Sequence, residues 1–236
     1  MVRLCFQKCS TDSVRIQTKI AVAVALLGAA SMAQAVSITF GGCKPSDASG
    51  QTTCVAGATV VNFNGSLGGL PAGYTSTGGA GGTVVTGTAS QFAQPGGATS
   101  DLTPYLSTPS PGNNAVGEVT AVIGGNYNYF GLYWGSMDAY NTLSFYNAQG
   151  TEIASLTGAQ VIAQGVALGN QTAAGSNQYV NFWFGGQTFD KVVFDSTNFA
   201  FESDNHAYAN VPEPATLGLL GLGLAGVGFM RRRKAS

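Results

Sequence analysis

The segment Tyr179-Val-Asn-Phe-Trp-Phe-Gly-Gly186 indicates the fold class of this chain of 236 residues. Aromatic and β-branched residues dominate the segment, and these residue types favour the pleated, half-buried surface of a β-strand. The run is too short for a typical globular helix, and the glycine pair that ends it is a turn signal. The segment therefore predicts one short strand that leads into a turn.

Similar short segments recur along the middle of the chain. Turn signals separate them, such as Gly124-Gly125 and Asn147-Ala-Gln-Gly150. We find no convincing amphipathic helix and no fixed-period repeat, so we expect an all-β fold with a single, jelly-roll-like β-sandwich. The segment 67–111 is rich in Gly, Thr and Ser, and it predicts long loops around one or two edge strands. The other predicted strands cover residues 36–40, 143–145, 152–156 and 191–194.

The composition argues against several classes of protein. Hydrophobic residues make up 44% of the chain and charged residues only 9%, which is too apolar for a disordered protein. Between residues 36 and 210, two basic residues, Lys44 and Lys191, stand against nine acidic ones. Because an acidic body cannot neutralise phosphate groups, nucleic acid is not expected as a partner. His206 is the single histidine, which argues against histidine-centred catalysis and multi-histidine metal sites.

The N-terminus has the pattern of a secretory signal peptide, which we predict for residues 1–35. Basic residues precede an apolar core that starts at Ile20, and two small residues, Ala33 and Ala35, stand on either side of Gln34. Signal peptidase is therefore expected to cut after Ala35. The alternatives are a short buried helix or a retained anchor. The apolar run is, however, shorter than the roughly 20 residues that a bilayer span needs.

The C-terminal segment 211–236 contains three features in a fixed order. It begins with Val211-Pro-Glu-Pro214, whose prolines fix φ and remove backbone donors, so we expect an extended, protease-accessible strip. The uncharged residues 215–230 follow, and they predict a short transmembrane helix. The basic residues after this helix are expected to stop transfer and to stay cytoplasmic, which leaves the acidic body outside. They are Arg231, Arg232, Arg233 and Lys234.

This order of motifs in residues 211–236 resembles the PEP-CTERM sorting signal of exosortase-dependent surface proteins. The resemblance implies that the C-terminal helix holds the protein transiently in the inner membrane of a Gram-negative bacterium. It also implies that exosortase cuts the chain near Pro212 to Pro214 and that the body reaches the cell surface or the extracellular matrix. It gives no information about what the body binds.

Cys43 and Cys54 lie close together at the start of the predicted mature chain. Because export brings the chain into an oxidising compartment, we expect a disulfide between them. A bond that closes a loop of this size stabilises a protein by roughly 3 kcal/mol on the chain-entropy model. The alternatives are weaker, since a zinc site lacks partner ligands and a catalytic thiol would have only the distant His206 as a base.

Two groups of residues in the body are candidate ligand sites. Tyr133, Trp134 and Trp183 could form a platform on which sugar rings stack, but packing in the core explains the same aromatic residues. Glu202 and Asp204 could supply carboxylate oxygens to a structural Ca²⁺, the one cofactor we consider, but a solvated strand edge explains them too. We favour core packing and the solvated edge, and we expect His206 to be a surface or edge residue.

The sequence thus predicts a signal peptide (1–35), a secreted β-sandwich body (36–210) and a sorting segment (211–236). We expect a structural or adhesive protein of an extracellular polysaccharide or biofilm matrix. A carbohydrate-binding module with an aromatic face is the first alternative, and a polysaccharide hydrolase is the second. Catalysis is not expected, because no acidic residue lies in a glycosidase motif and no GxSxG elbow accompanies His206.

Overall fold

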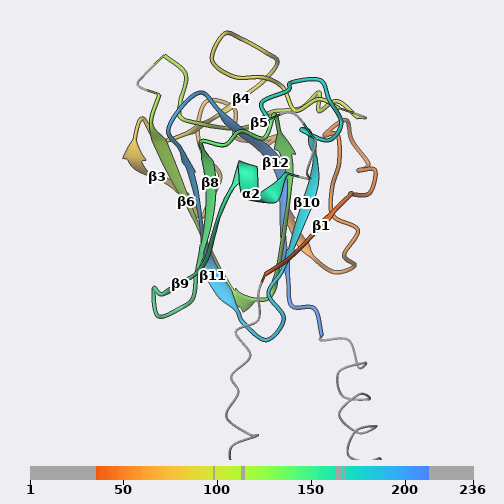
Figure 1. Cartoon of the computed structure of the whole chain (residues 1–236), viewed down its shortest axis with the longest axis vertical. Helices are drawn as coiled ribbons and strands as arrows, with labels where there is room; N and C mark the ends of the chain where they lie inside the picture. The colour runs from red at the N-terminus through yellow and green to blue at the C-terminus, as the bar shows by residue number, and fades with distance from the viewer. Residues whose placement is uncertain (1–35, 98, 113–114, 163–165, 167, 213–236) are drawn as a thin grey trace, which may run out of the picture. The chain divides into compact units, whose positions relative to one another are not determined.

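Two antiparallel β-sheets pack face to face and form the body of the protein (Figure 1). The computed structural model describes residues 36–212, except for 98, 113–114, 163–165 and 167. The predicted all-β sandwich is confirmed. The predicted signal peptide, with Ala33 and Ala35, lies outside the described residues, as does the sorting segment from Glu213 onward. Across the described part, none of the helices has the length and apolar character that a membrane span requires.

The larger sheet has seven strands, and the last strand of the chain, β12 (Phe201–Ala209), lies near its middle. The order across the sheet is β1 (Ser37–Phe40), β10 (Gln178–Trp183), β7 (Tyr129–Gly135), β12, β5 (Tyr105–Thr108) and β4 (Thr83–Val85), with β2 (Thr59–Val61) paired to the second half of β12. Strands β7 and β12 therefore have hydrogen-bonded neighbours on both sides.

The smaller sheet has five strands, in the order β3 (Tyr74–Gly79), β6 (Gly117–Tyr127), β11 (Phe189–Ser196), β8 (Asn141–Tyr146) and β9 (Glu152–Thr157). A single helical turn, α2 (Gly158–Val161), follows β9. It begins at a capping box, in which Thr157 accepts a hydrogen bond from the amide of Gln160, and Gln160 accepts one from the amide of Thr157.

The five strands predicted from apolar alternation are all present, as β1, β8, β9, β10 and β11. The segment 67–111 contains the edge strands β3 and β4, as predicted, and also β5, which lies between β12 and β4. Alternation does not reveal β7 and β12, because nearly every residue in these two strands is buried.

Aromatic side chains make up much of the core between the two sheets. Along β7, Phe130, Leu132 and Trp134 belong to the core cluster, as the alternation of side chains in a strand requires. Trp134 stacks on Phe201 of β12, with ring centroids 4.4 Å apart. Full burial of an apolar side chain of this size stabilises the fold by about 1.5–3 kcal/mol. Further fully buried members of the cluster are Phe63, Phe145, Phe182, Phe184, Phe189 and Phe194.

The chain enters and leaves the body at the same end of the sandwich. The register across the larger sheet aligns one residue from each of four strands in a row, namely Ser37, Trp183, Tyr129 and Ala209. At this end, Asn128 joins β6 of the smaller sheet directly to β7 of the larger one. Strand β7 runs from here to the opposite end, over a distance of about 20 Å at ~3.3 Å per residue. We call the end at Asn128 the tail end and the end at Gly135 the loop end.

Candidate functional site

The predicted sorting strip leaves the body at the tail end, where Asn128 binds the backbone of Val211. The side-chain oxygen of Asn128 accepts a hydrogen bond of 2.7 Å from the Val211 amide, and its side-chain nitrogen donates one of 2.8 Å to the Val211 carbonyl. Val211 is half-buried and packs against the cluster that contains Tyr129 and Ala209, whereas Pro212 is exposed. The body thus holds the first residue of the strip and presents the second to solvent.

Val211 and Pro212 are the two predicted sorting residues that the structure describes. Because proline lacks an amide hydrogen, Pro212 cannot continue the hydrogen-bonded ladder of β12. Glu213 and Pro214 lie outside the described residues, and so do the predicted stop-transfer residues Arg231, Arg232, Arg233 and Lys234.

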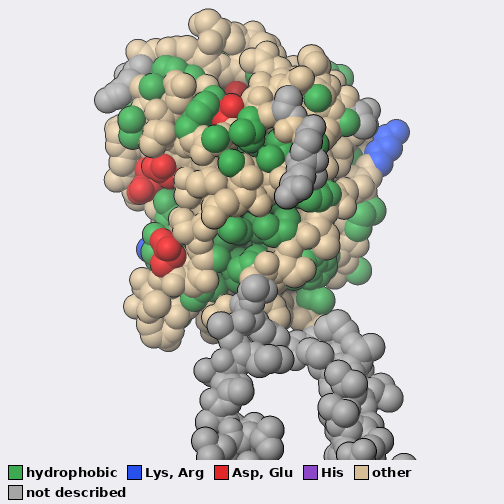
Figure 2. Space-filling model, viewed as in Figure 1, with side chains coloured by type: hydrophobic (Ala, Val, Ile, Leu, Met, Phe, Trp, Pro, Cys, Tyr) green, Lys and Arg blue, Asp and Glu red, His purple; other side chains and the backbone are tan. Residues whose placement is uncertain are grey.

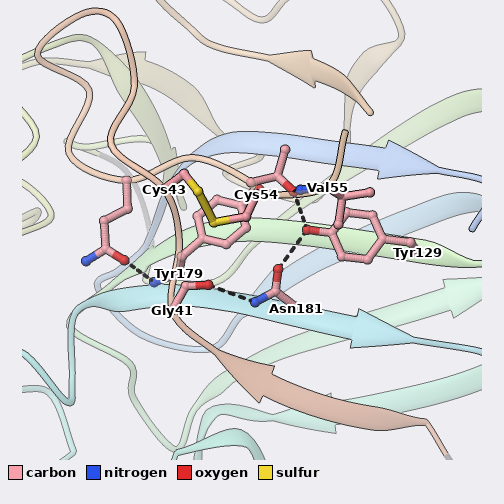
Figure 3. The surroundings of a disulfide bond; sticks show 9 residues. Gly41, Cys43, Cys54, Val55, Tyr129, Tyr179 and Asn181 are labelled. Carbon is pink, nitrogen blue, oxygen red and sulfur yellow. Dashed lines mark hydrogen bonds between the residues drawn. A yellow bond between two sulfur atoms is a disulfide. The ribbon is translucent and has the colours of Figure 1, made fainter. Parts of the chain in front are cut away.

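The predicted disulfide between Cys43 and Cys54 is confirmed (Figure 3). The two Cα atoms are 5.1 Å apart, and the closed segment, which we call the disulfide loop (residues 43–54), lies against β10 and β7. Within the loop, the backbones of Cys43 and Thr52 exchange hydrogen bonds of 2.8 and 2.9 Å. The covalent bond therefore closes a loop that also has its own backbone pairing.

Hydroxyl and amide groups attach the disulfide loop to the sheet. The hydroxyl of Tyr129 donates a hydrogen bond of 2.7 Å to Asn181, and the side-chain oxygen of Thr53 lies 2.7 Å from the same hydroxyl (Figure 3). Asn181 in turn donates a hydrogen bond of 3.1 Å to the carbonyl of Gly41. Sequence patterns do not mark Tyr129 and Asn181 as partners, since 52 positions separate them.

The sugar-stacking platform suggested by Tyr133, Trp134 and Trp183 is not formed. Tyr133 and Trp134 are fully buried, and Trp183 keeps only partial exposure. Trp134 points into the core. Tyr133 is on the other face of β7, where its ring lies against Gly50 of the disulfide loop and its hydroxyl lies against the carbonyl of Gly96. Because loops cover the outer face of β7, both of its faces are buried.

The acidic group on β12 is also buried, so the expectation of a solvated edge is wrong. Glu202 and Asp204 expose 2% and 0% of their surface, and His206 exposes 0%, which corrects its prediction as a surface residue. Glu202 accepts hydrogen bonds from the amide of Ala93 at 2.7 Å and from the hydroxyl of Ser136 at 2.8 Å. Burial raises the pKa of Glu202 to about 8. The reason for the correction is that β12 is a central strand whose outer face the loops cover.

These contacts do not support the hypothesis that Glu202 and Asp204 hold Ca²⁺. Both oxygens of Glu202 are already bound to protein donors. Within the described part of the chain, acidic, histidine and cysteine side chains form no group of three or more that could hold a metal ion.

Asp204 faces Asp101 from the loop before β5, and the two carboxyl groups lie within hydrogen-bonding reach. Burial raises the pKa of Asp101 to about 6. Burial, and then the charge of Asp101, raise the pKa of Asp204. Among the described residues, no N–H or O–H donor reaches Oδ2 of Asp101 unless Asp204 carries a proton. A single proton on the pair supplies that donor and removes the repulsion between two buried negative charges.

His206 and Ser203 form a hydrogen-bonded pair that looks like part of a hydrolase triad. Nε2 of His206 lies 2.9 Å from the hydroxyl of Ser203, and Nδ1 lies 2.9 Å from the hydroxyl of Tyr74. The imidazole ring stacks on Phe194, with centroids 4.6 Å apart. Burial lowers the pKa of His206 to about 3, so the ring is neutral near pH 7. Because Ser203 and His206 have no exposed surface, a substrate cannot reach them in this arrangement.

A cleft of about 430 Å³ opens at the loop end. Two segments of the chain line this cleft, residues 88–100 and residues 171–172, and they approach each other where Gly96 lies against the backbone of Gln171. The cleft lies beside the end of strand β7, because its lining residue Pro95 contacts Gly135. The described lining residues carry neither a charge nor an aromatic ring. Their amide and hydroxyl groups can form hydrogen bonds with a neutral polar ligand. They are Thr88, Ala93, Gln94, Pro95, Gly96, Gly97, Ser100, Gln171 and Thr172.

The face of the body in Figure 2 carries acidic side chains in small, separate groups among uncharged residues. Lys191, one of the two basic residues of the body, lies over the ring of Tyr146 with its Nζ atom 4.1 Å from the centroid. This face, as far as its residues are described, shows no continuous basic patch of the kind that a phosphate backbone attracts.

Comparison with protein-family models finds the PEP-CTERM protein-sorting motif at residues 210–234. No curated protein matches the chain. Among solved structures, the enzymatically active domain of tailspike protein 4 from bacteriophage CBA120 aligns with 16% identity and a TM-score of 0.30, over 58% of this chain and 19% of that chain. A likeness of this extent supports no argument about fold or activity.

The motif begins at residue 210, directly after the last residue of β12, so all strands of the body precede it. PEP-CTERM sorting implies export, processing by exosortase and delivery to the cell surface. The chain therefore carries a C-terminal PEP-CTERM protein-sorting motif that marks it as an exported, exosortase-processed protein.

Proposed function

We propose that the body is a structural or adhesive component of an extracellular polysaccharide matrix. The observation that carries this proposal is the position of the sorting motif, which follows β12 without a linker. A cut in the strip after Val211 leaves the sandwich and its disulfide intact. The released product is therefore a complete folded body rather than a fragment.

In this proposal, signal peptidase removes residues 1–35, and the C-terminal segment holds the protein in the inner membrane until exosortase cuts. The register places Ser37 and Ala209 in one row at the tail end. The cleft at Gly135 therefore lies at the end of the sandwich away from the point of attachment, where it is available to the polysaccharide.

A carbohydrate-binding module is the second candidate, and the cleft at the loop end favours it. Gln94 and Gln171 both belong to the uncharged lining of this cleft. Amide and hydroxyl groups suit the hydroxyl groups of a neutral sugar. This candidate replaces the aromatic face, because Tyr133 and Trp134 are buried.

We also propose that the protein is not an enzyme. Support comes from the burial of Ser203, Glu202 and His206, which removes the groups that a hydrolase would use from contact with solvent. Release of reducing sugars from matrix polysaccharide by the purified protein would contradict this part of the proposal and favour the hydrolase alternative.

The sorting step can be tested with the full chain carrying a tag after Ser236. In a host with exosortase, we expect the body at the surface or in the matrix without its tag. In the same host without exosortase, the body should keep the tag and stay in the inner membrane. Equal processing in the two hosts would contradict exosortase processing.

The matrix role can be tested with the mature protein recovered from that host. We expect it to co-sediment with the matrix polysaccharide of the host, and failure to do so would contradict a matrix role. The double variant Gln94→Ala/Gln171→Ala separates the two candidates. Loss of co-sedimentation would favour the cleft of a binding module, whereas unchanged co-sedimentation favours a broader adhesive surface. The exposed turn variant Gln149→Ala is the matched control.

A further inference from the structure

Asn128 forms hydrogen bonds with two other segments of the chain at the tail end, residues 184–185 and 209–211. Its amide donates to the carbonyl of Ala209 at 3.2 Å, and its carbonyl accepts from the amide of Phe184 at 2.9 Å. Its side-chain nitrogen donates to the carbonyl of Gly185 at 3.2 Å as well as to that of Val211 at 2.8 Å. Since Asn128 is itself anchored on β12 and on the segment after β10, its side chain is a fixed holder for Val211.

Both backbone hydrogen-bonding groups of Val211 are occupied by this holder. The amide of Val211 donates to Asn128 at 2.7 Å, and its carbonyl accepts from Asn128 at 2.8 Å. An enzyme that binds an extended peptide pairs with the same backbone groups of its substrate. The single amide hydrogen of Val211 is not available for such a pair while Asn128 holds it, and Pro212 has no amide hydrogen to contribute.

We propose that Asn128 is a positioning residue for the sorting reaction. By holding Val211, it sets the N-terminal limit of the strip that exosortase can engage. The inference rests on the exosortase processing described above. While Asn128 holds Val211, the enzyme reaches the chain only from Pro212 onward. If Asn128 no longer holds Val211, the accessible strip becomes longer in the direction of β12. Exosortase can then bind the chain in a second position and cut it closer to Ala209.

The test compares the full chain and Asn128→Ala, each with a tag after Ser236, in a host with exosortase. Pulse labelling measures the rate of tag loss, and mass spectrometry identifies the last residue of the released body. We expect Asn128→Ala to lose the tag several-fold faster. We also expect some released bodies to end closer to Ala209 than the wild-type body does. The cut position distinguishes this inference from a general loss of stability, which would change the rate of tag loss without favouring a new last residue.

Asn147→Ala is the matched control. The side-chain oxygen of Asn147 accepts hydrogen bonds of 3.1 and 2.9 Å from the amides of Gln149 and Thr151, in the turn between β8 and β9. The variant therefore loses backbone contacts of the same kind without touching Val211. Asn128→Asp keeps the acceptor for the Val211 amide but loses the donor for its carbonyl. We expect an intermediate rate from this variant.

The outcomes separate this inference from the proposed function. If the wild-type chain keeps its tag, exosortase processing and this inference both fail. If the wild-type chain is cut but Asn128→Ala matches Asn147→Ala in rate and cut position, only this inference is overturned. Slower processing of a folded Asn128→Ala body would overturn it as well. If Asn128→Ala does not fold, Asn128→Asp decides, and wild-type processing of that variant counts against the inference.

Discussion

Gly50 determines how closely the disulfide loop approaches the sheet. Its φ is +73°, and a Cβ atom added there would lie 2.3 Å from Cε1 of Tyr133. Glycine meets both demands, because it accepts a positive φ and has no side chain to displace the ring. The loop can therefore lie directly on Tyr133 and exclude water from it.

Replacement of Gly50 by alanine should destabilise the body more than replacement of Gly57. Both residues have a similar positive φ, +73° and +76°, but a Cβ atom at Gly57 meets nothing within 4 Å. We expect Gly57→Ala to cost about 1–2 kcal/mol for the left-handed backbone conformation. Gly50→Ala should cost a further ~1–3 kcal/mol for overpacking against Tyr133. Denaturant unfolding of the mature protein measures both losses, and equal losses would contradict the close contact.

Glu202 should make the body less stable as the pH rises. Burial raises its pKa from 4.5 to about 8, so the folded state binds more protons than the unfolded state between these values. Its contribution to stability is complete below pH 4.5 and is lost as the pH rises through 8. Burial lowers the pKa of His206 from 6.5 to about 3. Its contribution to stability is therefore complete above pH 6.5 and is lost as the pH falls below that value. The range from pH 6.5 to 8 therefore reports on Glu202 together with the Asp101 and Asp204 pair, whose pKa values burial also raises.

Unfolding free energies at pH 6.5 and 8 test this reasoning. At about 1.4 kcal/mol per pKa unit, we expect the wild-type body to lose about 1–2 kcal/mol over this range. Glu202→Gln should lose clearly less, with a residual loss from the Asp101 and Asp204 pair. The exposed Glu152→Gln variant should keep the wild-type loss. A wild-type body that gains stability toward pH 8 would show that Glu202 is ionised without cost.

Strand β7 and the disulfide loop depend on each other. Every residue of β7 is buried, one face by the core and the other by loops. The loop itself has little core of its own, and its attachment relies on the disulfide and on contacts such as Thr53 with Tyr129. Loss of the disulfide should therefore loosen the cover of β7 while the core between the sheets remains.

The double variant Cys43→Ser/Cys54→Ser should lower the free energy of unfolding by about 2–4 kcal/mol, because the unfolded chain regains the freedom of the open loop. The variant body should also be cut by proteases within residues 43–54 under conditions in which the wild-type body resists. Added reductant should reproduce the loss in the wild-type protein and have no further effect on the variant. Reductant that leaves wild-type stability unchanged would contradict a stabilising role for the bond.

The arrangement of the chain ends relates the fold to sorting. The first and last strands of the body meet the tail end, and the cleft opens about 20 Å away at the other end of β7. Both ends of the body therefore lie at the end of the sandwich from which the sorting strip leaves. Pro212 is exposed beside this folded end.

Replacement of Pro212, Glu213 and Pro214 by alanine should leave the protein exported but uncut. Alanine does not fix φ as proline does, and Glu213 contributes the single charge of the strip. Fractionation with an antibody to the body and a tag after Ser236 should find the tagged protein in the inner membrane. Replacement of Arg231, Arg232 and Arg233 by serine should instead let some protein pass through unanchored. An alanine variant that loses its tag at the normal rate would show that the strip is not the sorting site.

Local chemistry explains why much of this protein can be predicted from its sequence. Alternating apolar residues mark β1, β8, β9, β10 and β11, since the alternation follows directly from strand geometry. The Cys43–Cys54 bond follows from two nearby cysteines and an oxidising compartment. The sorting motif at residues 210–234 consists of consecutive residues, so it can be recognised in the sequence without knowledge of the fold.

Contacts between distant segments decide the rest, because burial depends on what covers a strand and not on the strand itself. The sequence predicts a polar strand edge at three residues of β12, Glu202, Asp204 and His206. In the structure, β12 lies inside its sheet and loops cover its outer face, so all three are buried. No sequence motif includes Asn128, although it binds Val211, 83 positions away. A sequence pattern records which side chains alternate, whereas the tertiary structure alone determines which faces are covered and which polar groups meet there.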